Sequence, residues 1–233
     1  MNIAVILSGG VGSRMKLDQP KQYIVVNNQP VVNYCLTTFL NNGRINAMVV
    51  VVDKQWRDCI ERLITQHASA KSVYYAEPGE TRQYSIYNAL KEIESHGYDE
   101  KDIVIIHDAA RPLVSNELID HCLDGCQLAD AVMPVIPIKD TVYYSKDANH
   151  IDSLLDRGHL WAGQAPEAFV FGKYLQAHKD MSREELLKIN GSTEIAYKAG
   201  LECKLIEGDI MNFKITTPED LSNFETILNT ENK

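Results

Sequence analysis

Residues 1–23 read MNIAVILSGGVGSRMKLDQPKQY, and this stretch decides the fold. Ile3–Leu7 is a short, uninterrupted apolar run, which is typical of a strand buried on both faces of a parallel sheet. The glycine-rich segment Ser8–Ser13 follows directly. Because glycine tolerates positive φ and close backbone approach, successive N–H groups there can point at phosphate oxygens. Arg14 and Lys21 then supply positive charge, so we predict a phosphate-binding loop at the carboxyl edge of a sheet.

Two common glycine motifs do not match this loop. The sequence contains no G-x-x-x-x-G-K-[ST], which excludes a P-loop, and a Rossmann fingerprint would need glycine where Met15 stands. The glycines alone are also compatible with an ordinary tight connection between a strand and a helix. Arg14 and the Pro20-Lys21-Gln22 run favour the phosphate role.

The composition is that of an ordinary globular protein, with 233 residues, 45% of them hydrophobic and 24% charged. We predict a single domain over residues 1–233. The net charge of −9 and the lack of like-charge runs argue against nucleic acid and anionic membranes as partners. No apolar stretch reaches the roughly 18 residues of a membrane span, and no secretion signal is recognisable, so we expect a cytoplasmic location.

The chain alternates apolar runs with helical patterns, which predicts a Rossmann-like, mostly parallel twisted α/β sheet with helices on both faces. After the first strand we expect strands at 47–52, 73–76, 102–107, 131–135 and 203–206, a strand-like run at 212–216, and helices at 31–40, 55–67, 81–94, 115–129, 171–178, 192–199 and 217–228.

The alternation stops near Pro137. Residues 138–161 indicate a protruding β-arm, with one strand at 141–144, a polar turn at 145–149 and residues 150–152 leading into the return. Because an isolated hairpin is only marginally stable, such an arm usually packs on a second subunit. We therefore expect residues 138–161 to mediate dimerisation.

Polar residues follow predicted strands at Gly79–Ser85 and Asp108–Arg111, and Lys214 lies in the strand-like run. In a parallel sheet these positions meet at one edge. Asp108 is placed to hold a divalent cation, although it can also cap a turn, with Arg111 as its structural ion-pair partner. Lys214 is either a third cation or a solvated lysine, and His107 either a base or a packed neutral ring. Several cations and one metal-binding carboxylate, with no protein nucleophile, are typical of sites that catalyse phosphoryl or nucleotidyl transfer.

The motifs SGGVGSRM, PKQY, HDAARP, RGHLWAGQAPEAF and NFKITTPEDL, in this order, resemble the cytidylyltransferases that activate polyol phosphates. The nearest groups are methylerythritol-phosphate and ribitol-phosphate cytidylyltransferases, and the resemblance runs from Ile3 to Leu221. It implies that CTP and a polyol phosphate give a CDP-polyol and pyrophosphate, with Mg²⁺ or another divalent cation as cofactor. It also implies a homodimer.

The resemblance assigns roles to residues at matching positions. Arg14 and Lys21 would neutralise the transition state, and Lys214 would contact the α-phosphate. Asp108 would hold the metal ion, while a second metal carboxylate such as Asp209 stays open. The acceptor would be bound by Arg111, Thr141 and Arg157, with Arg157 shared across subunits. The nucleotide would be bound by Leu7, Ser8, Gly9, Gly10, Gly12, Ser13, Pro78, Gly79, Arg82, Ser85 and Ala109.

Two segments depart from the family pattern and bear on the acceptor. Asn190–Glu194 stands where methylerythritol enzymes carry T-D-[DE]-A-S, and Ala165-Pro166-Glu167 replaces T-P-Q. Acidic contacts to polyol hydroxyls are therefore lost or moved. We prefer an alditol phosphate, ribitol or glycerol phosphate, used for capsule or teichoic-acid synthesis. The alternatives are the 2-C-methyl-D-erythritol 4-phosphate cytidylyltransferase of isoprenoid synthesis, a sugar-phosphate nucleotidyltransferase using another base, and a nucleotide-binding module without catalysis.

Overall fold

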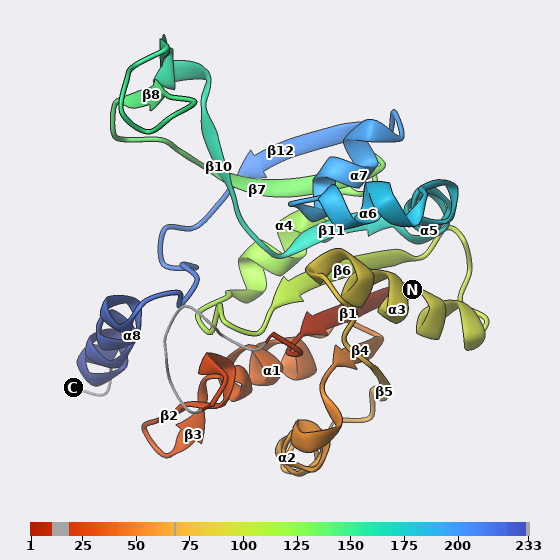
Figure 1. Ribbon diagram of the computed structural model, residues 1–233. Helices are drawn as coiled ribbons and strands as arrows, with labels where there is room; N and C mark the ends of the chain where they lie inside the picture. Colours follow the sequence, from red (N-terminus) through yellow and green to blue (C-terminus); the bar gives the residue numbers. More distant parts are fainter. Residues whose placement is uncertain (11–18, 68, 232–233) are drawn as a thin grey trace.

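A mixed sheet of eight strands forms the centre of the described structure, in the order β10-β7-β11-β6-β1-β4-β5, with β12 paired to β7 (Figure 1). The computed structural model describes residues 1–10, 19–67 and 69–231. The strands of this sheet are β1 (Asn2–Leu7), β4 (Ala47–Val51), β5 (Ser72–Ala76), β6 (Ile103–Asp108), β7 (Ala131–Pro137), β10 (Trp161–Gly163), β11 (Glu167–Val170) and β12 (Cys203–Glu207). Two small ribbons are formed by β2 (Val25–Val26) with β3 (Gln29–Pro30) and by β8 (Val142–Tyr144) with β9 (Ser153–Leu155).

The helices cover both faces of the sheet, as the sequence predicts. They are α1 (Val31–Asn41), α2 (Lys54–Thr65), α3 (Arg82–Ser95), α4 (Asn116–Gly125), α5 (Phe171–Asp180), α6 (Arg183–Lys188), α7 (Ser192–Lys198) and α8 (Pro218–Glu231), with 3-10 turns at Lys21–Tyr23 and Arg157–His159. One apolar core joins the sheet to α1, α2 and α4, and a second joins it to α3, α5, α6 and α7. None of the described helices is long and apolar enough to cross a bilayer.

Strand register decides where the polar loops meet. β1 runs parallel to both β4 and β6, and Leu7 is the partner of Val51 on one side and of Asp108 on the other. β4 is parallel to β5, with Val51 opposite Ala76. The carboxyl ends of these four strands therefore form one edge, from which the segments after Leu7, Ala76 and Asp108 emerge.

The structure corrects several sequence-based boundaries. Two short strands, β10 and β11, were not predicted, and both run antiparallel to their neighbours. The return strand of the arm is β9, which follows directly on residues 150–152. Residues 212–216 form no strand, because Ile215 N–H bonds to Ala110 O and the segment crosses the end of the sheet. α4 ends at Gly125, before the predicted boundary at 129.

A buried polar network joins α3 to α5 and α7. His178 Nδ1 lies 2.8 Å from Tyr174 O, which can only accept, so this nitrogen carries the proton and Nε2 accepts from the Gln83 amide at 2.8 Å. Tyr174 OH in turn donates to Ser192 O. Burial lowers the pKa of His178 to about 4, and burial also lowers the pKa of His107 to about 4. Both rings are therefore packed neutral groups.

These two histidines predict a specific loss of stability in acid. Because their folded-state pKa values lie below the ordinary value of 6.5, the unfolded chain binds more protons between about pH 6.5 and 4. The free energy of unfolding should fall as the pH is lowered through this window. Urea denaturation at several pH values measures it. His178→Gln should flatten the dependence and His121→Gln, at an exposed position, should not; parallel curves for the wild type and His178→Gln would contradict the assignment.

Candidate active site

Gly9 brings the loop after β1 into contact with the loop after β5, and Gly79 lets that second loop pack closely on α3. A Cβ on Gly9 would lie 2.5 Å from Pro78 Cβ, and a Cβ on Gly79 would lie 2.3 Å from Tyr84 Cβ. No side chain larger than hydrogen fits at either position. Gly79 N–H also donates to Ser85 Oγ at 3.0 Å, so the turn after β5 is fixed to the first turn of α3. The predicted nucleotide loops thus form one continuous surface.

The first glycine loop is held from behind by Gln22 and Tyr23. Gln22 Nε2 donates to Ser8 O and Gly10 O, both at 2.8 Å, and the Tyr23 hydroxyl lies 2.8 Å from Ser8 Oγ. Tyr23 stacks on Trp56 with 4.0 Å between ring centroids. Sequence reasoning assigned a role only to Lys21 in this segment. A buried glutamine following a glycine loop was the missed signal, since glutamine is rarely buried without a structural partner.

Asp108 is the centre of a charged cluster at the end of β6. Its Oδ1 accepts from Arg82 Nε at 3.0 Å, and its Oδ2 accepts from Lys214 Nζ at 2.9 Å. Arg111 Nε lies 3.8 Å from the same Oδ2. The three cations come from α3, from the segment before α8 and from the loop after β6. Burial alone would raise the pKa of Asp108, but Arg82 and Lys214 outweigh it and hold that pKa well below the usual range.

The segment that carries Lys214 is fixed by reciprocal amide contacts. Gln164 Nε2 donates to Asp209 O at 2.8 Å, and Asp209 N–H donates to Gln164 Oε1 at 3.0 Å. Asn212 donates to Ala165 O, while Arg111 donates to Asn212 O at 2.7 Å. Lys214 is therefore a fixed member of the cluster, and the interpretation of it as a solvated edge lysine is wrong.

A second buried carboxylate lies beside this cluster. Glu167 Oε2 is 3.5 Å from Arg82 Nη2, and Glu167 Oε1 accepts from Thr193 Oγ1 at 2.9 Å. Arg82 also donates to Ser192 Oγ. Asn190–Glu194 and Glu167, noted separately in the sequence, therefore meet at Arg82.

The structure gathers some predicted site residues and leaves others apart. The nucleotide-loop residues at the common edge are Leu7, Ser8, Gly9, Gly10, Pro78, Gly79, Ser85 and Ala109, whose N–H bonds to Leu7 O. Gly12, Ser13 and Arg14 lie outside the described residues. Thr141 and Arg157 belong to the arm, and no described hydrogen bond or ion pair joins them to Asp108; Arg157 instead donates to Lys139 O. The guanidinium of Arg82 engages Asp108, and its predicted contact with the nucleotide stays a prediction.

The donor chemistry fits a divalent cation held mainly by a substrate. Asp108 offers one buried carboxylate, and the described residues contain no group of three His, Cys, Asp or Glu side chains able to hold a metal. Asp209 Oδ1 instead accepts from Met211 N–H in a local turn. Mg²⁺ is commonly bound by one or two carboxylates together with substrate phosphates, and Asp108 suits that arrangement.

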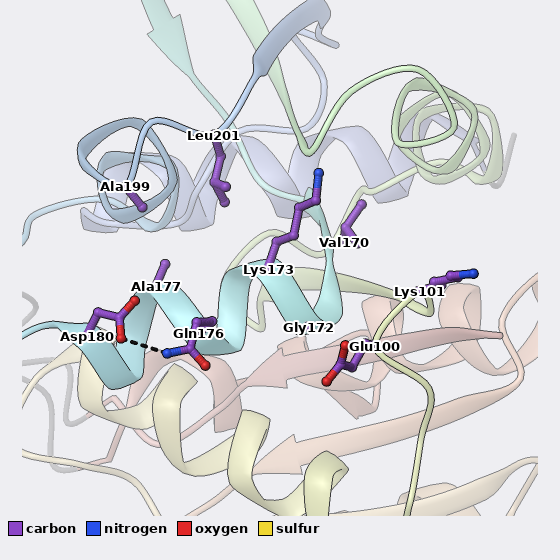
Figure 2. Close-up of a pocket in the computed structure, with 10 residues that line it drawn as sticks. All are labelled: Glu100, Lys101, Val170, Gly172, Lys173, Gln176, Ala177, Asp180, Ala199 and Leu201. Carbon is purple, nitrogen blue, oxygen red and sulfur yellow. Dashed lines mark hydrogen bonds between the residues drawn. The ribbon is translucent and has the colours of Figure 1, made fainter.

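A cavity of about 580 Å³ opens at the opposite edge of the sheet, and it contains none of the predicted site residues. Figure 2 shows its lining, contributed mainly by α5 and by the residues before β6: Glu100, Lys101, Val170, Gly172, Lys173, Gln176, Ala177, Asp180, Ala199 and Leu201. Because β6 begins at Ile103 and Asp108 ends it, this cavity is separate from the charged cluster.

The mostly parallel sheet, the glycines at its carboxyl edge and the cations around one aspartate fit a nucleotidyltransferase, and comparison with known proteins identifies the chain as a cytidylyltransferase acting on a phosphorylated polyol. The family model for 2-C-methyl-D-erythritol 4-phosphate cytidylyltransferase matches residues 2–230, and the chain belongs to this family.

Individual relatives agree with this membership. The chain is 36% identical to a 2-C-methyl-D-erythritol 4-phosphate cytidylyltransferase of Clostridium beijerinckii, covering 94% of each chain. It is 31% identical to a ribitol-5-phosphate cytidylyltransferase of Vibrio parahaemolyticus, covering 99% of this chain and 97% of the relative. The crystal structure of 4-diphosphocytidyl-2C-methyl-D-erythritol synthase from Anaerococcus prevotii superposes with a TM-score of 0.82, at 24% identity and over 98% of this chain and 96% of that one, which confirms the predicted fold.

Removing the support behind the glycine loop should weaken nucleotide binding. Gln22→Ala deletes both bonds to the loop carbonyls, so the loop amides are no longer pre-oriented. We expect the Kd for CTP, measured by isothermal titration calorimetry, to rise about tenfold, roughly the effect of losing one to two net hydrogen bonds. Gln55→Ala, at an exposed position of α2, is the matched control. Equal affinities for the two variants would show that Gln22 does not organise the loop.

Proposed function

We propose that this protein transfers CMP from CTP to 2-C-methyl-D-erythritol 4-phosphate. The observation that carries the proposal is the family model, which spans residues 2–230 and is named for this reaction. It is supported by relatives of the same name at 33–36% identity. These matches favour the alternative interpretation of the sequence over the preferred one, an alditol phosphate for capsule or teichoic acid. The two departing segments were given too much weight, because they are short parts of a long match.

The reaction forms one phosphorus–oxygen bond and breaks another. A phosphate oxygen of the acceptor attacks the α-phosphorus of CTP, and pyrophosphate leaves with the electrons of the broken bond. Lys214 is proposed to exchange Asp108 for the α-phosphate, and Lys21 and Arg14 to neutralise charge that develops during transfer. Arg111, anchored on Asn212 O, is proposed to meet the acceptor phosphate. Mg²⁺, held by Asp108 and the nucleotide, would screen the triphosphate. A cytoplasmic location remains part of the proposal.

Ribitol 5-phosphate is the second candidate acceptor. The Vibrio parahaemolyticus relative, whose name specifies this substrate, matches nearly the whole chain at 31% identity. In addition, Gly191 and Ser192 replace acidic residues of the methylerythritol pattern, which changes the charge at the N-terminus of α7.

An acceptor panel distinguishes these candidates. Pyrophosphate release should be measured with CTP and Mg²⁺ and with methylerythritol, ribitol, glycerol or sugar phosphates as acceptors. We expect kcat/KM for methylerythritol phosphate to exceed that for ribitol phosphate at least tenfold, with UTP and GTP poorly used. A preference for ribitol phosphate would establish the second candidate. Binding of CTP without turnover of any acceptor would refute both.

The arm supports a proposed homodimer. It projects beyond β10 and β7 (Figure 1) and exposes apolar side chains, with Tyr143 at 56% and Leu154 at 64% relative exposure. Such residues are usually covered in an assembly. A partner's arm is proposed to bring Thr141 and Arg157 to the acceptor site, because neither contacts the charged cluster within one chain.

Subunit complementation tests the shared arginine. Arg157→Ala and Lys214→Ala should each be nearly inactive alone. If Arg157 serves the partner subunit, one of the two sites in each mixed dimer has both Lys214 and Arg157. About half of the dimers in an equal, freely exchanging mixture are mixed, so the mixture should recover about a quarter of wild-type activity. Light scattering coupled to size-exclusion chromatography checks the dimer. No recovery in a mixture shown to exchange subunits would place Arg157 in its own subunit's site or outside the site altogether.

A further inference from the structure

Glu167 is a buried charge that the proposed reaction does not use. It begins β11, where it pairs in register with Ile106 of β6, two residues before Asp108. Side chains two positions apart on a strand share a face, so Glu167 and Asp108 lie diagonally on the same face of the sheet. Both are at least nine-tenths buried. A buried carboxylate is costly unless it is paired, and the partner available to both is Arg82.

Arg82 is held from three directions. Its Nε donates to Asp108, its Nη1 donates to Ser192 Oγ, and its Nη2 faces Glu167 at 3.5 Å. Ser192 is fully buried, and Thr193 ties the other oxygen of Glu167 to the first turn of α7. The guanidinium therefore faces acceptors from β6, β11 and α7, one for each of its three nitrogens.

The second strong cation on Asp108 is bound differently. Among the described residues, the only carboxylate that Lys214 Nζ contacts is Asp108, at 2.9 Å, and the ammonium sits on a flexible stem. When a phosphate competes for these cations, Lys214 can change partners by rotating its side chain. Arg82 would have to leave Glu167 and Ser192 as well as Asp108.

We propose that Glu167 is a positioning residue that, with Ser192 and Thr193, keeps Arg82 on Asp108 while Lys214 moves to the nucleotide. Asp108 then keeps its hydrogen bond from Arg82 after Lys214 has left, and Arg82 does not follow Lys214 to the phosphates. This role rests on the proposed cytidylyl transfer. Glu167 adds a buried negative charge next to the first turn of α7, whose own acidic residue is Glu194.

The test is a double-mutant cycle in steady-state kinetics with CTP and the acceptor phosphate that the panel identifies. Glu167→Gln keeps the volume and an oxygen for Thr193 but removes the charge. We expect kcat to fall at least tenfold, KM for CTP and acceptor to change less than about threefold, and Tm to fall only a few degrees. In an Arg82→Gln background the same substitution should change kcat less than about threefold, because its target is gone. Glu225→Gln, an exposed position on α8, is the matched control and should behave as wild type.

Several results would overturn the role. Glu167 would be merely structural if the fold-changes in kcat caused by Glu167→Gln and Arg82→Gln multiply in the double variant. The same conclusion would follow if a large fall in Tm explained the loss of activity. If Arg82→Gln does not fold, Thr193→Val tests the role instead, because it removes the hydrogen bond to Glu167 without removing charge. A threefold to tenfold lower kcat supports the role, and an unchanged kcat contradicts it. If the wild type is active and Glu167→Gln leaves kcat unchanged, only the role of Glu167 is refuted. If the wild type is inactive with every acceptor, the proposed function is refuted as well.

Discussion

The buried carboxylate of Asp108 is the constraint on which the rest of the site depends. An ionised group at the end of a buried strand must be compensated, and here the compensation comes from α3, from the loop after β6 and from the segment before α8. These elements are far apart in sequence, so their attraction to one charge fixes the geometry of the sheet edge. The same interaction gathers the cations that we propose to act on the nucleotide and the acceptor phosphate.

The nucleotide half of the molecule follows from the sequence because its determinants are local. An apolar run followed by Ser8-Gly9-Gly10 specifies a strand and a turn without reference to the rest of the chain. Parallel strands end at a common edge of the sheet, and the observed register places Asp108 beside Leu7. The fold class and the position of Asp108 at the end of a buried strand were accordingly foreseeable, while its binding of a metal ion stays a prediction.

The acceptor half was less predictable because its contacts are not local. β10 and β11 have only three and four residues, too few for a clear period, and their antiparallel pairing depends on β6 and β7, which lie well upstream in the sequence. Lys214 seemed to lie in a strand because Phe213 and Ile215 are apolar, yet those side chains pack against α8 and its neighbours. The hydrogen bond from Thr193 to Glu167 and the ion pair of Glu167 with Arg82 join segments that no local sequence pattern connects.

The position of β11 has a consequence for how the chain is made. This strand separates β6 from β7, although both precede it in sequence. As the protein emerges from the ribosome, one side of β6 stays without a hydrogen-bonding partner until residues 167–170 have been synthesised. An exposed apolar edge of this kind can pair with other chains, so we expect the nascent chain to be open to aggregation in the interval between synthesis of β6 and of β11.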